Sequence, residues 1–224
     1  MYCISTKVCF YSLEIDYNSL VNLILRLISG SRWWGQPALP ESVEMPYFVE
    51  GTFATPMTLV CQINCAEFKQ EHPDHQMAQL LPDKGLISCF AYLDYFFGDL
   101  DANSTGIHLG DWDEHTFQVI YSPDTSNLRL HEIMDEDGHE CSIPAEAEQV
   151  PAEHHEESYM LKGPTLYQDE IEQEHPDYIT LVQLDESDRH NLRFYDCGCL
   201  FFLIKPDDLQ HLRFDQVKCC LYCM

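Results

Sequence analysis

Two stretches of the chain share the same order of apolar and polar positions. The first runs from Thr58 to Tyr95 and the second from Thr180 to Leu209. In each, a Leu-, Val- and Ile-rich run ends in Gln and then Asn or Asp, a hydrophilic insert follows, and Asp-x-Gly precedes a second run with aromatic residues. Apolar runs bounded by turn residues predict β-strands. The chain is therefore predicted to contain a strand pair in two copies.

The two copies align on a few polar residues. Gln62 and Asn64 match Gln183 and Asp185, and Gly85 matches Gly198. We expect both glycines to adopt a positive φ. The offset of roughly 120 residues is too long for a solenoid repeat. These features predict an α+β fold, a duplicated and mostly antiparallel β-sheet module with few helices, whose halves are related by a pseudo-twofold axis.

The remaining pattern completes a domain plan. Apolar residues at helical spacing predict a helix from Leu13 to Ser29, ended by Gly30. Ala66 to Leu81 is predicted to hold one short helix interrupted by Pro73, and Phe97 to His115 to be a surface excursion. Two further strands are expected at Phe117–Tyr121 and Leu128–Ile133. The plan has an N-terminal helical segment (1–30) and a single domain (31–224) made of two repeats (about 31–135 and 159–224).

Charge limits the partners that the chain can have. It carries 38 Asp and Glu residues against 12 Lys and Arg residues, a formal net charge of −26. The acidic residues are dense in 145–157, which is predicted to be a connector between the repeats. Such a charge opposes binding to nucleic acid and favours either a basic partner or a merely solvated surface. The oligomeric state is not predicted.

The cysteines and the apolar runs indicate a cellular compartment. The chain has an odd number of cysteines, eleven, and several lie inside apolar runs, among them Cys61, Cys89 and Cys199. We expect them to be reduced and buried, as in a cytoplasmic protein. No stretch reaches the roughly 20 apolar residues that span a membrane, and the N-terminus lacks the features of a secretory signal. No membrane contact is therefore expected.

Catalytic and cofactor signatures are not recognised in the sequence. It contains no Gly-x-Ser-x-Gly elbow and no Gly-rich phosphate loop. Potential metal ligands occur in short clusters, but a structural zinc site usually needs two paired motifs, and only Cys220-x-x-Cys223 has the pair spacing. We therefore predict no metal, no cofactor and no catalytic residue.

The most informative polar residues are the two glutamines in apolar strands. An unpaired amide there costs roughly 1–3 kcal/mol, so both are expected to be hydrogen-bonded. They either serve the structure or line a cleft between the repeats together with Asn64 and Asp185. The tandem indoles of Trp33 and Trp34 lie in a Pro- and Gly-containing loop and either cap the core or line that same cleft. Such a cleft suits a peptide or a small polar molecule.

Several motifs in this order resemble the YwqG-like family of bacterial domains of unknown function. They are Trp34-Gly35-Gln36-Pro37-Ala38-Leu39-Pro40, Gln62-Ile63-Asn64, Leu81-Pro82-Asp83-Lys84-Gly85, Phe117-Gln118-Val119-Ile120-Tyr121, Gly163-Pro164-Thr165-Leu166-Tyr167-Gln168, Leu181-Val182-Gln183-Leu184-Asp185 and Asp196-Cys197-Gly198. The resemblance covers roughly 31–224 and implies an α+β fold with duplicated sheets. It adds Gln168 to the cleft candidates. The chain departs from the family at Tyr195, where Gly is usual, and at its Cys-rich end.

Two hypotheses about function follow. The first is a non-enzymatic cytoplasmic binding protein that holds a basic protein partner, for example an immunity-type protein. The second is an enzyme or a small-ligand-binding protein that uses the cleft between the repeats. The candidate residues for that cleft are Trp33, Trp34, Gln62, Asn64, Gln168, Gln183 and Asp185.

Overall fold

The computed structural model describes residues 28–97, 106–134, 138–140, 142–143, 158–161 and 166–223. The expected helix at 13–29 lies outside these residues except for its last two positions, which are helical. The expected acidic connector at 145–157 lies outside them as well.

Two antiparallel sheets form the body of the protein. The first has the order β1-β5-β6-β8, with β1 at Arg32–Trp33, β5 at Thr58–Asn64, β6 at Leu86–Ala91 and β8 at Phe117–Ser122. The second has the order β10-β11-β12-β13-β7, with β10 at Tyr159–Met160, β11 at Ile179–Asp185, β12 at Cys199–Ile204, β13 at Lys218–Tyr222 and β7 at Gly110–Asp111. The strands expected in both copies are therefore present.

Smaller elements complete the fold. Two short antiparallel pairs are β2 (Ala38–Pro40) with β9 (Leu128–Leu130) and β3 (Tyr47–Glu50) with β4 (Phe53–Pro56). The α-helices in the described residues are α2 (Cys65–Glu71), α3 (Gln76–Leu80), α4 (Gln168–Glu174) and α5 (Pro206–Gln210). The 3₁₀ turns are η1 (Asp94–Phe97), η2 (Glu114–Thr116) and η4 (Phe214–Gln216). The expectation of mostly antiparallel sheets with few helices is confirmed. No helix in the described part of the chain is long and apolar enough to cross a membrane.

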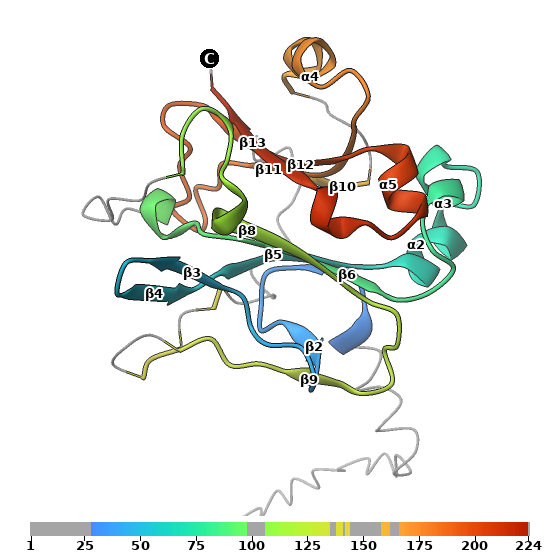
Figure 1. Ribbon diagram of the computed structural model, residues 1–224, viewed down its shortest axis with the longest axis horizontal. Coiled ribbons are helices and arrows are strands. Elements are labelled where there is room, and N and C mark those ends of the chain that lie inside the picture. The colour runs from blue at the N-terminus through green and yellow to red at the C-terminus, as the bar shows by residue number, and fades with distance from the viewer. Residues whose placement is uncertain are drawn as a thin grey trace, which may run out of the picture.

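The elements stack in four layers (Figure 1). From bottom to top these are the β2–β9 pair, the first sheet, the second sheet and α4. The main core lies between the two sheets because alternate strand residues point into that space. Cys61, Ile63 and Cys89 face it from the first sheet, and Val182 and Leu184 face it from the second.

The outer face of each sheet has its own apolar cluster. On the first sheet, Leu59 and Phe90 pack with Leu39 and Phe48, and the Phe48 ring stacks on Tyr92 with centroids 4.2 Å apart. On the second sheet, a separate cluster packs under Ile171 of α4. Each sheet is thus buried on both faces, which accounts for the near-continuous apolar runs in its strands.

Strand β7 corrects one expectation. The Asp-rich segment 97–115 was expected to be only a surface excursion, yet Asp111 pairs with Cys220 and Gly110 with Leu221 of β13. Trp112 holds this crossing in place: its backbone N–H donates to the Cys219 carbonyl at 2.8 Å. A strand from the first half of the chain therefore forms an edge of the second sheet.

Turn geometry confirms one glycine expectation and corrects another. Gly85 has a φ of 102°, as expected. Gly198 does not have a positive φ; its role is close approach, because a Cβ there would lie 2.4 Å from the Phe194 carbonyl oxygen. The left-handed residue of that turn is Tyr195, with a φ of 64°. This is the position at which the chain departs from the resembled family by lacking a glycine.

Helix boundaries follow the prolines. The one interrupted helix expected at 66–81 is two helices, because α2 ends at Glu71, ahead of Pro73, and α3 begins only at Gln76. Helix α5 begins at Pro206, whose fixed φ and missing N–H suit a first helical position.

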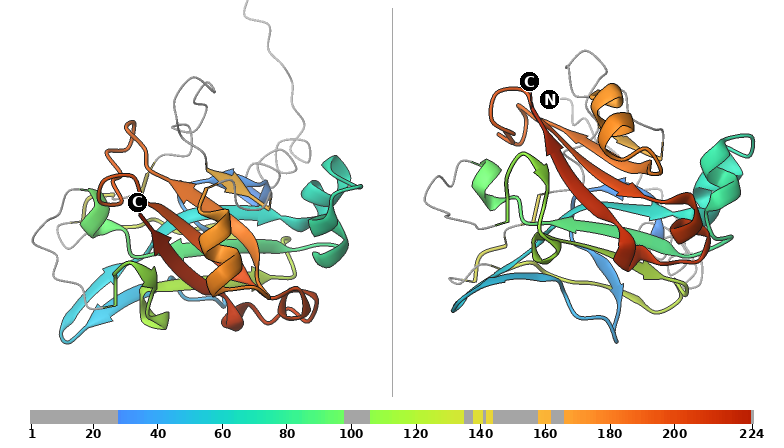
Figure 2. Two further views of the ribbon diagram at one scale, coloured as in Figure 1. Left: turned by 90° about the horizontal axis from the view of Figure 1, so that it is seen from above. Right: turned by 45° about the horizontal axis from the view of Figure 1, so that its top comes forward.

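Figure 2 shows the β3–β4 pair projecting away from the stacked layers.

Candidate functional site

Gln62 has a structural environment. It is fully buried, its Oε1 accepts from the Ala38 N–H at 3.1 Å, and its Nε2 donates to the Ala38 carbonyl at 2.9 Å and to the Ser88 hydroxyl at 2.7 Å. This amide therefore adds two hydrogen bonds to the backbone of β2, which also pairs with β9, and joins the bottom layer to the first sheet.

Asn64 and Asp185 also bond locally. Asn64 Oδ1 accepts from the Glu67 N–H at 3.1 Å and caps α2, while its Nδ2 donates to the Ser29 carbonyl. Asp185 Oδ1 accepts from the N–H of Glu186 at 2.9 Å. Asn64 is thus a helix cap, and Asp185, which aligns with it in the sequence, orders the turn that follows β11.

The tandem tryptophans lie at the core. Trp34 is 4% exposed and belongs to the main core, with Trp33 packed partly buried against it. The Trp34 ring meets His190 edge to face, with centroids 5.7 Å apart. Of the two interpretations of this loop, core capping describes Trp34.

The structure does not bring the candidate glutamines together. Gln62 faces the bottom layer, whereas Gln183 pairs opposite Phe201, on the face of the second sheet covered by α4. Gln168 begins α4 and donates to the Glu172 carboxylate at 2.7 Å. The side chains expected to line one shared cleft therefore lie in separate layers.

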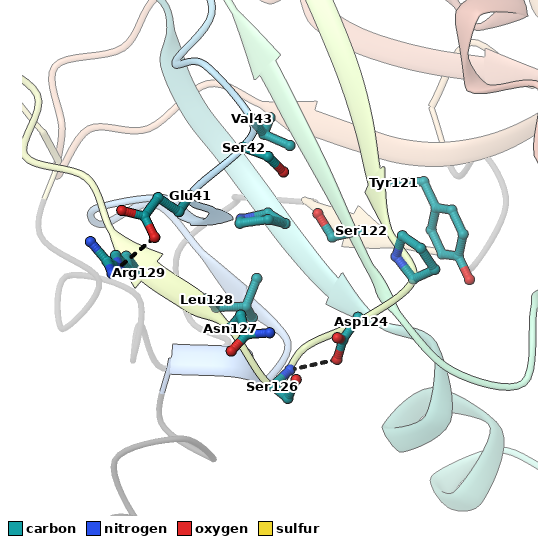
Figure 3. Close-up of a pocket in the computed structure, with 12 residues that line it drawn as sticks. Glu41, Ser42, Val43, Tyr121, Ser122, Asp124, Ser126, Asn127, Leu128 and Arg129 are labelled. Atoms are coloured by element: carbon teal, nitrogen blue, oxygen red, sulfur yellow. Dashed lines mark hydrogen bonds and ion pairs between the residues drawn. The ribbon is translucent and has the colours of Figure 1, made fainter.

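A groove of about 720 Å³ is present in the described part of the chain (Figure 3). Its walls are the link after β2 and the link between β8 and β9. The lining residues are Pro40, Glu41, Ser42, Val43, Tyr121, Ser122, Pro123, Asp124, Ser126, Asn127, Leu128 and Arg129. Because β2 pairs with β9, these distant segments meet at one edge of the bottom layer.

The groove presents carboxylates and one buried hydroxyl. Glu41 pairs with Arg129 at 3.0 Å, and the Asp124 Oδ1 accepts from the Ser126 N–H at 2.9 Å. That backbone N–H lowers the pKa of Asp124, so this carboxylate is ionised at neutral pH. Ser122 is 1% exposed, and its Oγ has no hydrogen-bond partner among the described residues. The groove can therefore accept hydrogen-bond donors and positive charge.

The sequence did not point to this groove. Its lining combines a turn-rich link with a Pro-Glu-Ser-Val segment, and neither contains a motif. The Ser-Pro-Asp-Thr-Ser-Asn sequence signalled a turn but not a binding surface.

A smaller cavity of about 280 Å³ lies between the two halves. It is bounded by α3 from the first half and by α4 and the start of β11 from the second. Its polar lining includes His75, Gln168 and Glu172, and its apolar lining includes Met77 and Ile171. Gln168 is the member of the predicted cleft set that reaches this space.

Two other features are an exposed apolar surface and a cluster of potential metal ligands. The outward face of the β3–β4 pair exposes Tyr47 and Val49, at 53% and 56%. On the second sheet, one potential ligand atom each from Asp111, His175 and Cys220 lie within 4.8 Å of one another. The eight cysteines that the structure describes are free thiols, and Cys61, Cys89 and Cys199 are buried as expected.

The fold and its sites define an α+β protein of two packed antiparallel sheets with an open acidic groove. The family model described as a domain of unknown function (DUF1963) matches residues 31–167 and 145–223. Because these matches span most of the chain, the protein belongs to this family. No curated protein matches it.

Proposed function

We propose that this protein is a non-enzymatic cytoplasmic binding protein that holds a basic segment of a protein partner in the groove between the β2–β3 and β8–β9 links. The observation that carries the proposal is the lining itself. It offers the carboxylates of Glu41 and Asp124, which accept hydrogen bonds from Lys and Arg side chains. A bacterial immunity-type protein that neutralises a basic toxin is one version of this role.

The charge of the whole chain supports a basic partner. A net charge of −26 creates a field that attracts cations and accelerates their encounter with the surface. The groove then supplies the local recognition. A Lys or Arg side chain of the partner competes with Arg129 for Glu41, and that existing ion pair shows that the carboxylate can hold a cation there.

The test uses labelled peptides and two charge-matched double variants. We expect a Lys- and Arg-rich peptide to bind the wild-type chain and a Glu-rich peptide of equal length not to bind, as measured by fluorescence anisotropy. Glu41→Gln with Asp124→Asn removes two charges inside the groove, and the amide oxygen introduced by Asp124→Asn can still accept from the Ser126 N–H. Glu71→Gln with Asp74→Asn removes two exposed charges elsewhere.

The groove variant is expected to weaken binding about tenfold or more, corresponding to about 1.4 kcal/mol, and the control variant to change it little. Equal weakening by both variants would mean that only the overall field attracts the peptide. Binding that persists at high salt would count against the electrostatic mechanism.

A second candidate function is small-ligand binding in the cavity between α3 and α4. It is favoured by the mixed lining, in which Gln168, Glu172 and His75 accompany apolar side chains. Soaking crystals with a fragment library tests it: fragments should gather against Gln168. Fragments that gather only in the larger groove would reject this candidate.

We further infer that the two sheets arose by duplication of one unit with pseudo-twofold symmetry. Three similarities support this inference. The orders β1-β5-β6-β8 and β10-β11-β12-β13 correspond, a register shift occurs at Leu59/Cys61 and at Thr180/Val182, and a 3₁₀ turn precedes the last strand in each. A rotation that fails to superpose all three long strands would refute it.

We also infer that the YwqG-like resemblance and the family match refer to the same group of proteins. Both reach from residue 31 to the end of the chain or one residue short of it. Family members that lack the Gln-Ile-Asn and Asp-x-Gly elements at these positions would argue against the inference.

A further inference from the structure

We propose that Asp111, His175 and Cys220 form a binding site for a transition-metal dication, and that Zn²⁺ is the ion that this ligand set fits best. The three residues come from β7, from the end of α4 and from β13. Thiolate, imidazole and carboxylate are the three protein ligands that Zn²⁺ accepts. The sequence spacing associated Cys220 only with Cys223, which is not part of this cluster.

The spacing of the ligand atoms suits one ion. One oxygen, one nitrogen and one sulfur lie within 4.8 Å of one another. In a tetrahedral zinc site with bonds of about 2.0–2.3 Å, ligand atoms are separated by about 3.3–3.8 Å. The nitrogen of His175 and the oxygen of Asp111, 2.9 Å apart, must therefore separate slightly, and the sulfur must approach them by up to about 1 Å. A water molecule takes the fourth position of the ion.

His175 supplies an independent indication. Its side chain is 7% exposed, and Nε2 lies 2.9 Å from the Asp111 Oδ1. Despite this short distance, Nε2 makes no hydrogen bond with any described residue, because the ring nitrogen and the oxygen are not aligned. Burying an unbonded ring nitrogen is costly. An ion bound to both atoms removes that cost, since the two atoms then point to the ion and not to each other.

The environment of Cys220 excludes a role as an accessible nucleophile. The side chain is fully buried, and its sulfur lies within 4.8 Å of the ligand atoms of His175 and Asp111. A thiol out of reach of substrates does not attack them, whereas a metal ion held by the neighbouring ligands deprotonates the thiol that it coordinates. Asp111 is 44% exposed in its side chain and gives an ion a path from solvent.

Lys218 is a cation that competes with a metal ion for Asp111. Its Nζ lies 2.5 Å from the Asp111 Oδ2 and 5.7 Å from the centroid of the Tyr178 ring. This ammonium neutralises Asp111 and repels an approaching dication. Its side chain is 37% exposed, so it can turn towards solvent when an ion binds. The proposal therefore predicts that removal of this charge strengthens metal binding.

Cobalt titration of the full chain tests the proposal. Co²⁺ takes the same ligands as Zn²⁺, and a cobalt–thiolate bond gives a charge-transfer absorption that carboxylate sites do not. Excess Mg²⁺ in the buffer occupies the many surface carboxylates, since Mg²⁺ prefers oxygen ligands. We expect one Co²⁺ per chain to produce this absorption. Added Zn²⁺ should displace the Co²⁺ and remove the absorption.

Variants separate this site from other histidines and thiols. Cys220→Ser should abolish the absorption, and Asp111→Asn and His175→Gln should each weaken binding about tenfold or more. Cys197→Ser, which changes an exposed thiol elsewhere, should leave both the cobalt–thiolate absorption and the metal affinity unchanged. Lys218→Gln should tighten binding several-fold.

Two outcomes would overturn the proposal. The first is a cobalt–thiolate absorption that survives Cys220→Ser. The second is unchanged affinity in Asp111→Asn, a variant at a half-exposed position that preserves side-chain size and is therefore expected to fold even where Cys220→Ser does not.

Discussion

At the scale of single residues, Gln62 shows how a polar side chain becomes part of an apolar core. Its amide makes three hydrogen bonds, two to the backbone of Ala38 and one to Ser88. Gln62→Leu removes all three and leaves buried polar atoms unpaired, so we expect a loss of about 3 kcal/mol in the free energy of unfolding in urea. Gln118→Leu, at an exposed position of β8, is the control and should change it by less than about 0.5 kcal/mol. An unchanged free energy of unfolding in Gln62→Leu would contradict this stabilising role of the three hydrogen bonds.

Tyr195 carries a second residue-scale prediction. Its φ of 64° is a left-handed conformation that costs a non-glycine residue roughly 1–2 kcal/mol. Tyr195→Gly relieves this cost but loses an edge-to-face contact with Phe96 and adds entropy to the unfolded chain. We expect Tyr195→Gly to raise the free energy of unfolding by about 0.5–1 kcal/mol, as measured by thermal unfolding. A loss of more than about 1 kcal/mol would show that the ring contact outweighs the strain.

Cys65 gives the pH prediction at this scale. Burial raises its pKa from 9.0 to about 12, so the folded state favours the neutral thiol. Its contribution to stability is complete below the unfolded pKa near 9 and is lost as pH rises towards about 12. The loss is up to about 1.4 kcal/mol per pH unit. Denaturant unfolding between these pH values measures this loss. The free energy of unfolding should fall less steeply with pH in Cys65→Ala than in the wild type, whereas in Cys197→Ala it should fall with the wild-type slope.

At the scale of elements, Trp112 controls the docking of β7. Its ring is 5% exposed, lies 5.8 Å from the Phe96 ring in a stacked arrangement, and donates through Nε1 to the His108 carbonyl. Trp112→Ala should cost about 3–5 kcal/mol and should speed hydrogen exchange at Leu221, the β13 residue opposite Gly110. Unchanged exchange there would mean that β7 docks without the ring.

The sequence predicted some elements well and missed others for physical reasons. Runs such as Leu200–Ile204 predicted strands because burial on both faces leaves almost no polar position in them. Strand β7 was missed because two residues, Gly110 and Asp111, carry no periodicity. The groove was missed because it depends on β2 meeting β9, and short apolar segments do not reveal their partner in the sequence.

At the scale of the whole molecule, the two halves complete each other. The main core combines residues of both sheets, and β7 crosses from the first half to β13 in the second. We therefore expect fragments 1–150 and 151–224 to be unfolded when produced separately and to assemble when produced together. Circular dichroism and co-elution in gel filtration provide the measurements. A fragment 151–224 that unfolds cooperatively alone would show an independent domain.

The acidic groove is the central claim about function, and an NMR titration tests it most directly. A ¹⁵N-labelled chain is titrated with an unlabelled Lys- and Arg-rich peptide. The account predicts that the shifted amides gather in 41–43, 121–122, 124 and 126–129, the groove residues that carry a backbone N–H. Shifts spread evenly over the acidic surface, or centred on Tyr47 and Val49 of the projecting β3–β4 pair, would contradict it.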